Sequence, residues 1–177
     1  MDTTDKDAPR VVYEGRYQRM VVRGTWEYSE RTHAGGLAAI ILAVTPEDRI
    51  LFVEQFRVPL QARTIEMPAG LVGDIDAGES IEASAIRELE EETGWTAERA
   101  EVLMIGPTSS GASSEKVAFV RATGLRKVGE GGGDGTEDIT GFGEQFSRMV
   151  HNGKRLVLRC TDALGTVLLV DGDVAGD

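Results

Sequence analysis

The segment from Ser80 to Gly94 constrains the fold of this chain more than any other. Its apolar residues recur with a helical period between Ile81 and Thr93. Ser80 is a favourable N-cap residue, and Gly94 can adopt the left-handed backbone conformation that ends many helices. The sequence therefore predicts a helix over residues 81–93.

This predicted helix carries a high concentration of acid, because four of the five residues from Glu88 to Glu92 are glutamates. With about 100° per residue, Glu88, Glu91 and Glu92 share one arc of the helix. The neighbouring arc is apolar and contains Ala85, Ile86 and Leu89. The carboxylates therefore border the buried face, where a low dielectric strengthens their mutual repulsion.

A divalent cation would turn this repulsion into binding. Hard cations such as Mg²⁺ prefer carboxylate and carbonyl oxygen, and they often bridge protein carboxylates to substrate phosphates. The alternative is an acidic helix surface that is solvated and binds nothing. The spacing of the residues around the glutamates favours a cation site over a solvated surface.

Strand patterns surround the helix on both sides. Residues 11–28 alternate apolar and polar positions, which predicts a small antiparallel sheet with turns at Gly15 and Gly24. Four more strands are predicted, the first two as continuously apolar, buried runs, at residues 36–44, 49–57, 100–106 and 116–123.

The remaining segments are less regular. Residues 68–78 are too irregular and rich in glycine for a strand, and residues 129–135 have so little side-chain bulk that they predict a mobile loop. Residues 144–153 predict a helix, whereas residues 155–170 fit a helix or a strand equally well. Strands mixed with helices predict a compact α/β domain.

Composition excludes several classes of partner. The chain has 177 residues and 41% hydrophobic content, which suits one globular core. A formal net charge of −11 argues against nucleic acid and anionic membranes as partners. The single cysteine, Cys160, cannot form an internal disulfide, and the first residues lack the pattern of a secretory signal, so we expect a cytoplasmic protein.

A longer pattern extends from Gly73 to Trp95. Its fixed positions are Gly73, Glu79, Arg87, Glu88, Leu89, Glu91, Glu92, Gly94 and Trp95. This spacing resembles the Nudix box, and the chain is similar to the Nudix hydrolase superfamily. The resemblance implies an α/β/α sandwich with a mixed sheet, whose box helix holds Mg²⁺, with Mn²⁺ as a possible substitute.

The resemblance also implies roles for the acidic residues. Glu88 and Glu92 correspond to the main metal ligands, joined by the Ala69 carbonyl and by Glu137 in a late loop. Glu91 corresponds to a further ligand or a catalytic base, and Arg87 to the residue that holds the carboxylates in place. The identity of the general base stays open between Glu137, Glu91 and Asp134.

The segment IEMPAG at residues 65–70 resembles the ADP-ribose pyrophosphatase branch, which includes hydrolases of other nucleoside diphosphate sugars. In that branch the glycine of this segment opens the box, whereas here Gly70 comes three residues before Gly73. The resemblance implies base stacking on Trp26 and a diphosphate contact from Arg57. The complete set of substrate-binding residues that it implies is Trp26, Glu27, Arg31, Arg57, Glu66, Leu71 and Glu115.

These residues lead to a specific expectation of function. The chain is expected to hydrolyse the diphosphate of ADP-ribose, a small nucleotide sugar, to AMP and ribose 5-phosphate. The alternatives are hydrolysis of other sugar nucleotides such as GDP-mannose, or nucleotide sensing without catalysis. By analogy with the branch, residues 1–35 form a strand arm exchanged within a homodimer, and residues 36–177 form the Nudix hydrolase domain.

Overall fold

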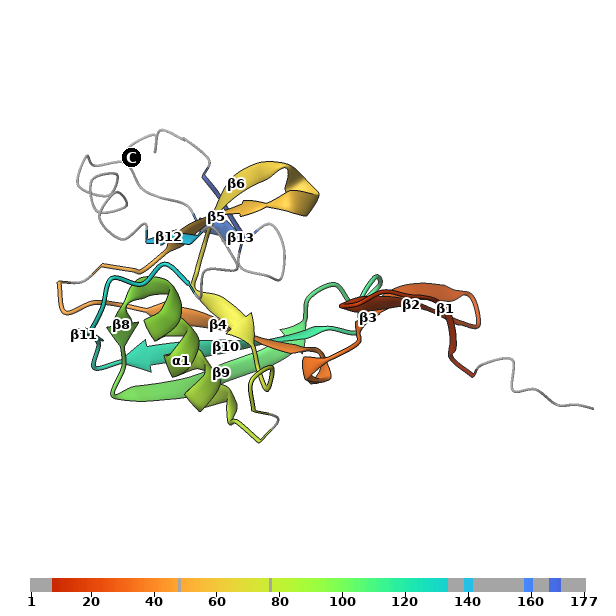
Figure 1. The fold of residues 1–177 in the computed structure, drawn as a ribbon, viewed down its shortest axis with the longest axis horizontal. Coiled ribbons are helices and arrows are strands. Elements are labelled where there is room, and N and C mark those ends of the chain that lie inside the picture. The colour runs from red at the N-terminus through yellow and green to blue at the C-terminus, as the bar shows by residue number, and fades with distance from the viewer. Residues whose placement is uncertain are drawn as a thin grey trace, which may run out of the picture.

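The computed structural model packs an α-helix on a four-stranded mixed sheet, and a three-stranded sheet projects away from this body (Figure 1). It describes residues 8–47, 49–76, 78–133, 139–141, 158–160 and 166–169. The mixed α/β class predicted from the sequence is confirmed. Within the described residues, no helix combines the length and apolar character needed to cross a membrane.

The central sheet has the strand order β7, β4, β10, β9. Its strands are β7 (Ala69–Leu71), β4 (Leu37–Ala43), β10 (Lys116–Thr123) and β9 (Arg99–Pro107). β4 and β10 run parallel, whereas β7 and β9 pair with them in the antiparallel sense. Three of these strands were predicted. The prediction that residues 68–78 contain no strand is wrong, because β7 lies within them. The pairing of β7 with β4 outweighs the effect of the glycine in β7.

Helix α1 (Ile81–Thr93) has the predicted bounds. The Ser80 hydroxyl accepts a hydrogen bond of 3.1 Å from the Ala83 amide, and Gly94 ends the helix with φ of 70°. Both termini therefore follow from local chemistry, since the cap satisfies an otherwise unpaired amide and glycine takes the left-handed conformation without strain.

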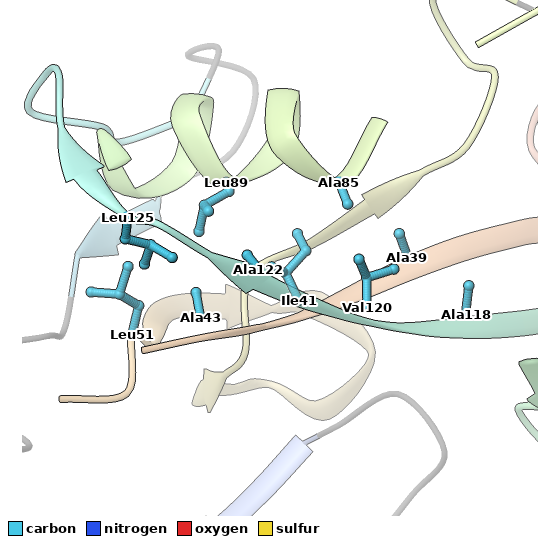
Figure 2. Close-up of a cluster of buried hydrophobic side chains, with 10 residues drawn as sticks. All are labelled: Ala39, Ile41, Ala43, Leu51, Ala85, Leu89, Ala118, Val120, Ala122 and Leu125. Atoms are coloured by element: carbon cyan, nitrogen blue, oxygen red, sulfur yellow. The ribbon is translucent and has the colours of Figure 1, made fainter. Parts of the chain in front are cut away.

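The core lies between α1 and one face of the central sheet (Figure 2). Every second residue of β4 and β10 points to the helix, as strand geometry requires. Ala85 and Leu89 meet these side chains from the helix. The complete cluster is Ala39, Ile41, Ala43, Leu51, Ala85, Leu89, Ala118, Val120, Ala122 and Leu125. Small residues on both strands let the helix pack closely, which fixes the height of its glutamates above the sheet.

The N-terminal sheet is antiparallel, as predicted. It consists of β1 (Arg10–Glu14), β2 (Gln18–Arg23) and β3 (Trp26–Arg31), in that order. The short 3-10 turn η1 (Ala34–Gly36) connects it to β4. Several large apolar side chains of this arm are exposed, among them Tyr13, Tyr17 and Trp26. Exchange of the arm between two copies stays a prediction.

A third sheet has the order β12, β5, β6, β14, β13 and is antiparallel throughout. Its strands are β12 (Ile139–Gly141), β5 (Val53–Arg57), β6 (Ala62–Glu66), β14 (Thr166–Leu169) and β13 (Leu158–Cys160), with the 3-10 turn η2 (Val58–Leu60) between β5 and β6. The ambiguous residues 155–170 thus contain two strands. The helix predicted over residues 144–153 lies outside the described residues.

Two short strands, β8 (Trp95–Thr96) and β11 (Arg126–Lys127), pair just beyond the end of α1. From β11 the chain continues into the glycine-rich segment, whose residues 129, 132 and 133 donate backbone hydrogen bonds to the end of α1 and the glycine that follows it. Residues 129–133 form a loop, as predicted, and these hydrogen bonds dock it on the end of α1, whereas its mobility stays a prediction.

Replacing Leu89 by alanine tests the core. Leu89 is fully buried, so we expect Leu89→Ala to lower the free energy of unfolding by about 2–5 kcal/mol. Leu103→Ala is the matched control, because Leu103 is 50% exposed on β9 and should cost less than about 1 kcal/mol. Urea unfolding measures both values, and equal losses in the two variants would contradict this packing.

Candidate active site

Helix α1 brings two buried glutamates against the main chain of β7. Glu88 is 9% exposed and Glu92 is 4% exposed, although both carry an ionisable carboxyl group. The Ala69 amide donates a hydrogen bond of 3.1 Å to Glu92 Oε2. Carboxylates are rarely buried to this degree without partners, so this placement marks a specialised site.

Gly70 makes the approach of Glu88 possible. A β-carbon built on Gly70 would lie 1.9 Å from Cδ of Glu88, well inside the contact distance of two carbon atoms. No other residue type fits there unless Glu88 moves. The glycine of the IEMPAG segment thus has a steric role that its position in the sequence alone does not reveal.

The environment of Glu88 opposes its ionisation. Burial raises the pKa of Glu88 to about 7, and the negative charges of Glu91 and Asp74 add to this effect against the attraction of Arg87. A carboxyl group with this pKa is half protonated near neutral pH. It gains from a bound cation much more than an exposed glutamate does.

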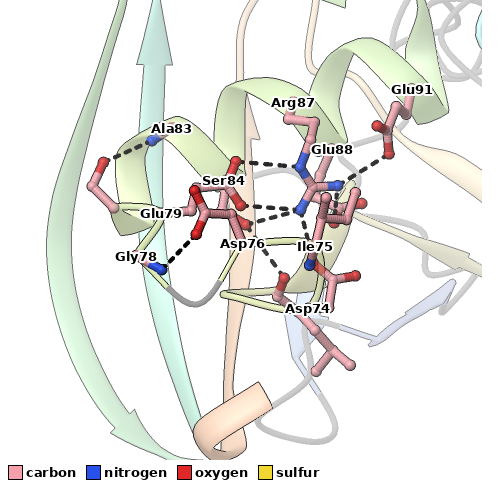
Figure 3. Close-up of polar contacts among 12 residues, drawn as sticks. Asp74, Ile75, Asp76, Gly78, Glu79, Ala83, Ser84, Arg87, Glu88 and Glu91 are labelled. Atoms are coloured by element: carbon pink, nitrogen blue, oxygen red, sulfur yellow. Dashed lines mark hydrogen bonds and ion pairs between the residues drawn. The ribbon is translucent and has the colours of Figure 1, made fainter. Parts of the chain in front are cut away.

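Arg87 lies at the centre of a carboxylate cluster (Figure 3). Its nearest contacts are Glu88 Oε1 at 2.9 Å and Asp74 Oδ1 at 3.0 Å from guanidinium nitrogens. Glu91 Oε2 follows at 3.2 Å, and Glu79 accepts from both Nε and Nη2 at 3.3 Å. Burial opposes the charge of Arg87. The hydrogen bond to Glu79 and the negative charge of Glu88 nevertheless raise the pKa of Arg87. The guanidinium group of Arg87 thus links the loop before α1 to the helix.

Two of the predicted substrate-binding residues pair with each other on the third sheet. Arg57 of β5 donates two hydrogen bonds to the Glu66 carboxylate of β6, at 2.9 and 2.7 Å. Burial works against ionisation, but the hydrogen bonds from Arg57 and Thr64 lower the pKa of Glu66. The structure therefore holds Glu66 as a carboxylate and fixes the orientation of the Arg57 guanidinium group.

The predicted base-binding residues gather where the arm meets the body. Arg31 of β3 forms an ion pair with Glu115, just before β10. The Ser29 amide donates to the Ala112 carbonyl at 2.9 Å, which ties β3 to the loop before Glu115. Trp26 is 61% exposed on the same strand, so it is not a core residue of a single chain. Glu27 is also exposed.

The structure gives less information about the roles of the remaining predicted residues. Leu71 is half-buried in β7, and its carbonyl accepts from the Ser84 hydroxyl at 3.4 Å. Glu137 and Asp134, two of the three candidates for the general base, lie outside the described residues.

No three Asp, Glu, His or Cys side chains of the described ranges are arranged so that they could hold a metal ion. The carboxylates of Asp74, Glu79, Glu88 and Glu91 are paired with Arg87. Glu88 and Glu92 nevertheless provide two oxygen-donor groups one helical turn apart, beside the main chain of Ala69. Oxygen donors of this kind suit a hard divalent cation.

An open cavity of about 760 Å³ lies on another side of α1. Its walls come from α1, including Ile86, Arg87 and Glu91, and from the segment after β11, where Val128, Gly129 and Gly131 line it. Glu88 and Glu92 do not line it. We place the candidate chemistry at β7, where the buried carboxylates lie, because cavity volume alone does not indicate reactivity.

Sequence reasoning missed two contacts of this site. Asp74 pairs with Arg87, although nothing in its sequence position distinguishes it from Asp76. Lys127 donates to the Thr93 carbonyl at 3.1 Å across 34 residues of chain. A lysine that follows a predicted strand carries no local signal of such a contact.

Comparison with known proteins identifies the family to which the chain is similar. Residues 35–134 match the NUDIX domain family. Among curated relatives, the ADP-ribose pyrophosphatase of Bacillus subtilis is 45% identical over 98 residues, which cover 55% of this chain and 50% of the relative. The methanol dehydrogenase activator of Bacillus methanolicus is 41% identical over 95 residues, covering 54% and 49%. The chain thus spans about half the length of these relatives.

A similar fold occurs among solved structures. A crystal structure of an ADP compounds hydrolase aligns with a TM-score of 0.60 and 21% identity, covering 82% of this chain and 80% of that chain. At this identity the comparison concerns the arrangement of helix and sheets.

Replacing Glu88 by glutamine tests the burial of its charge. Raising the folded-state pKa of an acid from 4.5 to about 7 lowers stability as the pH rises through this window, because the folded state binds the proton more tightly. Glutamine resembles the protonated form. In EDTA, the stability advantage of Glu88→Gln over the wild type should therefore grow between pH about 4.5 and about 7, and reach at most roughly 3 kcal/mol above pH about 7.

Urea unfolding between pH about 4.5 and about 8 measures this difference. The matched control is Glu90→Gln, because Glu90 is exposed on the same helix and should show no such change with pH. A wild type and Glu88→Gln protein with parallel pH profiles would contradict the assignment.

Proposed function

The chain belongs to the NUDIX domain family, and on that premise we propose that it hydrolyses the diphosphate of ADP-ribose to AMP and ribose 5-phosphate. The observation that carries the proposal is the burial of Glu88 and Glu92 against Ala69 and Gly70. Relatives named ADP-ribose pyrophosphatase from Bacillus subtilis and Mycobacterium tuberculosis support the choice of substrate.

The proposed site requires a divalent cation, and we propose Mg²⁺, with Mn²⁺ able to replace it. Glu88 and Glu92 would hold it, together with the Ala69 carbonyl and Glu137. When bound there, such a cation would supply positive charge against the diphosphate and would favour water as a nucleophile. The oxygen-only character of these groups and the raised pKa of Glu88 support this choice.

Residues of the chain position the reactants. Arg87 holds the carboxylates of the helix and the preceding loop in one cluster, so that little reorganisation is needed when the cation binds. Arg57 is oriented by Glu66, and its planar group suits contact with a diphosphate oxygen. Glu91, Glu137 and Asp134 remain the candidates for the general base.

The arm would bind the nucleoside. Trp26 offers an exposed aromatic face, and Arg31 and Glu115 lie at the junction of the arm and the body. We propose that Glu27 and Leu71 also contact the substrate. Stacking on an aromatic ring is worth about 1–3 kcal/mol per base, which makes Trp26 a suitable anchor for adenine.

We also propose a homodimer in the cytoplasm. The exposed apolar side chains of β1, β2 and β3 support association, since a monomer gains nothing from exposing Val11, Val12 and Tyr13 together. In such a dimer residues 1–35 would exchange, and Trp26 would serve the partner's site. Sedimentation of the full chain and of a chain without residues 1–35 tests this arrangement.

A broader sugar-nucleotide hydrolase is the nearest alternative. A relative from Mus musculus is named ADP-sugar pyrophosphatase and is 42% identical over 84 residues, covering 44% of this chain and 37% of that protein. A nucleotide sensor without catalysis is the other alternative, and the complete set of box glutamates argues against it.

A product assay separates these functions. The protein is incubated with Mg²⁺ and either ADP-ribose, GDP-mannose or a diadenosine polyphosphate, and the products are separated by anion-exchange chromatography. The proposal expects AMP and ribose 5-phosphate at the highest kcat/KM. Faster turnover of GDP-mannose would replace the proposed substrate, and binding of ADP-ribose without cleavage would identify a sensor.

Glu92→Gln tests the carboxylates directly. The substitution keeps the shape of the buried side chain but removes a charge that holds the cation, so kcat should fall by about a hundredfold or more. Glu90→Gln, on the exposed side of α1, should keep wild-type kcat. Steady-state kinetics with ADP-ribose compares them, and near-normal turnover by Glu92→Gln would reject this site.

Trp26→Ala tests the base-binding role of the arm. Loss of stacking worth about 1–3 kcal/mol should raise KM for ADP-ribose roughly five- to hundredfold. Trp26→Phe keeps an aromatic face and should recover most of the affinity. An unchanged KM in Trp26→Ala would show that the base binds elsewhere.

A further inference from the structure

The last turn of α1 presents an electrostatic problem. Glu91 and Glu92 lie beside the C-terminal end of the helix, where the unpaired carbonyls carry partial negative charge. Negative side chains are unfavourable at this end, and the last turn of α1 contains no basic residue. Arg87 offsets the charge of Glu91 from within the helix, but the last carbonyls need donors from outside it.

Residues 127–133, here called the glycine strap, supply the missing donors. The amide of Gly133 donates to the Glu91 carbonyl at 2.9 Å, and the amide of Gly132 donates to the Glu92 carbonyl at 3.0 Å. Lys127 Nζ donates to the Thr93 carbonyl at 3.1 Å. Each of the last three carbonyls of α1 therefore has a partner from one segment.

The strap continues past the end of the helix. The Gly94 carbonyl accepts from the amides of Val128 and Gly129, at 2.8 and 3.0 Å. The Lys127 ammonium group also lies 5.8 Å from the centre of the Trp95 ring. A positive charge and four backbone amides thus face the negative end of the helix, which is the favourable arrangement.

Two glycines make this contact as close as it is. Gly94 has φ of 70° and Gly131 has φ of 74°. A β-carbon on Gly131 would lie 2.5 Å from the Thr93 carbonyl carbon and 2.6 Å from the Glu92 oxygen. A β-carbon on Gly94 would lie 2.1 Å from the Gly129 oxygen. These neighbours are backbone atoms, so neither site can absorb a side chain by a rotamer change.

The carboxylates of the same turn belong to the candidate active site. Glu92 accepts from the Ala69 amide, and Glu91 pairs with Arg87. A shift of the last turn therefore moves both carboxylates relative to β7. We propose that the glycine strap, through Gly131, is a positioning element that fixes the last turn of α1 and thereby the cation affinity of its glutamates.

This inference rests on the proposed function, because it assumes that the glutamates bind a divalent cation. It assigns no catalytic contact to the strap. Gly131 acts through the backbone carbonyls of Glu92 and its neighbours. The side chain of Glu92 belongs to the proposed cation site.

The test uses two alanine variants in the same segment. A β-carbon on Gly129 would meet its nearest atom only at 4.0 Å, so Gly129→Ala keeps the strap in place. Gly131→Ala forces the strap away from the helix. Isothermal titration with Mn²⁺ should show affinity reduced by about 10- to 100-fold in Gly131→Ala, the range for supporting contacts of a metal site, and unchanged in Gly129→Ala.

A measurement on the wild type makes the test independent of folding. Coupling is reciprocal, so if the strap strengthens cation binding, Mg²⁺ must stabilise the strap. Hydrogen exchange of the Gly132 and Gly133 amides should slow when Mg²⁺ is added. Slower exchange in the rest of α1 with no change at these two amides would overturn the proposal, even if Gly131→Ala failed to fold.

The outcomes separate the two proposals. If the wild type and Gly131→Ala bind Mn²⁺ equally well, the strap proposal is wrong and the proposed hydrolase is unaffected. If the wild type binds Mn²⁺ and Gly131→Ala binds it poorly, but ADP-ribose is not cleaved, the strap proposal holds and the proposed substrate is wrong. A wild type that binds no cation overturns both.

Discussion

The candidate site depends on the close approach of a buried carboxyl group to a glycine of β7, which has no side chain. Glu88 lies against Gly70 so tightly that a β-carbon would overlap it, and Glu92 accepts from the amide of Ala69 beside it. Small residues on β4 and β10 let α1 settle close to the sheet, so the helix reaches β7 at this height. The proposed cation site and the apolar core therefore depend on the same packing of α1 against the sheet.

Arg87 offsets the electrostatic repulsion between the carboxylates of this arrangement. Four carboxylates surround its guanidinium group, two from the helix and two from the preceding loop. A protein with a net charge of −11 thus places a permanent cation among its most crowded acids. Four carboxylates around one guanidinium group leave an excess of negative charge, which favours the approach of a cation.

Local chemistry predicted α1 completely, because its cap, its period and Gly94 all lie within its own sequence. It predicted β4, β9 and β10 from their apolar patterns. It failed at β7, whose strand character comes from pairing with β4. It also gave no sign that residues 129–133 hydrogen-bond to the end of α1, because glycines carry no local signal of such a contact. The family resemblance named Glu88 and Glu92, but only the three-dimensional structure revealed the overlap at Gly70 and the pairing of Arg57 with Glu66.

The contact between Lys127 and Thr93 also has a consequence for the order of folding. The two residues are 34 positions apart, and β9 and β10 lie between them. Contacts that close long loops form after the local structure that shortens them. We therefore expect the last carbonyls of the acidic helix to gain these partners only after residues 127–133 have left the ribosome and β9 and β10 have paired.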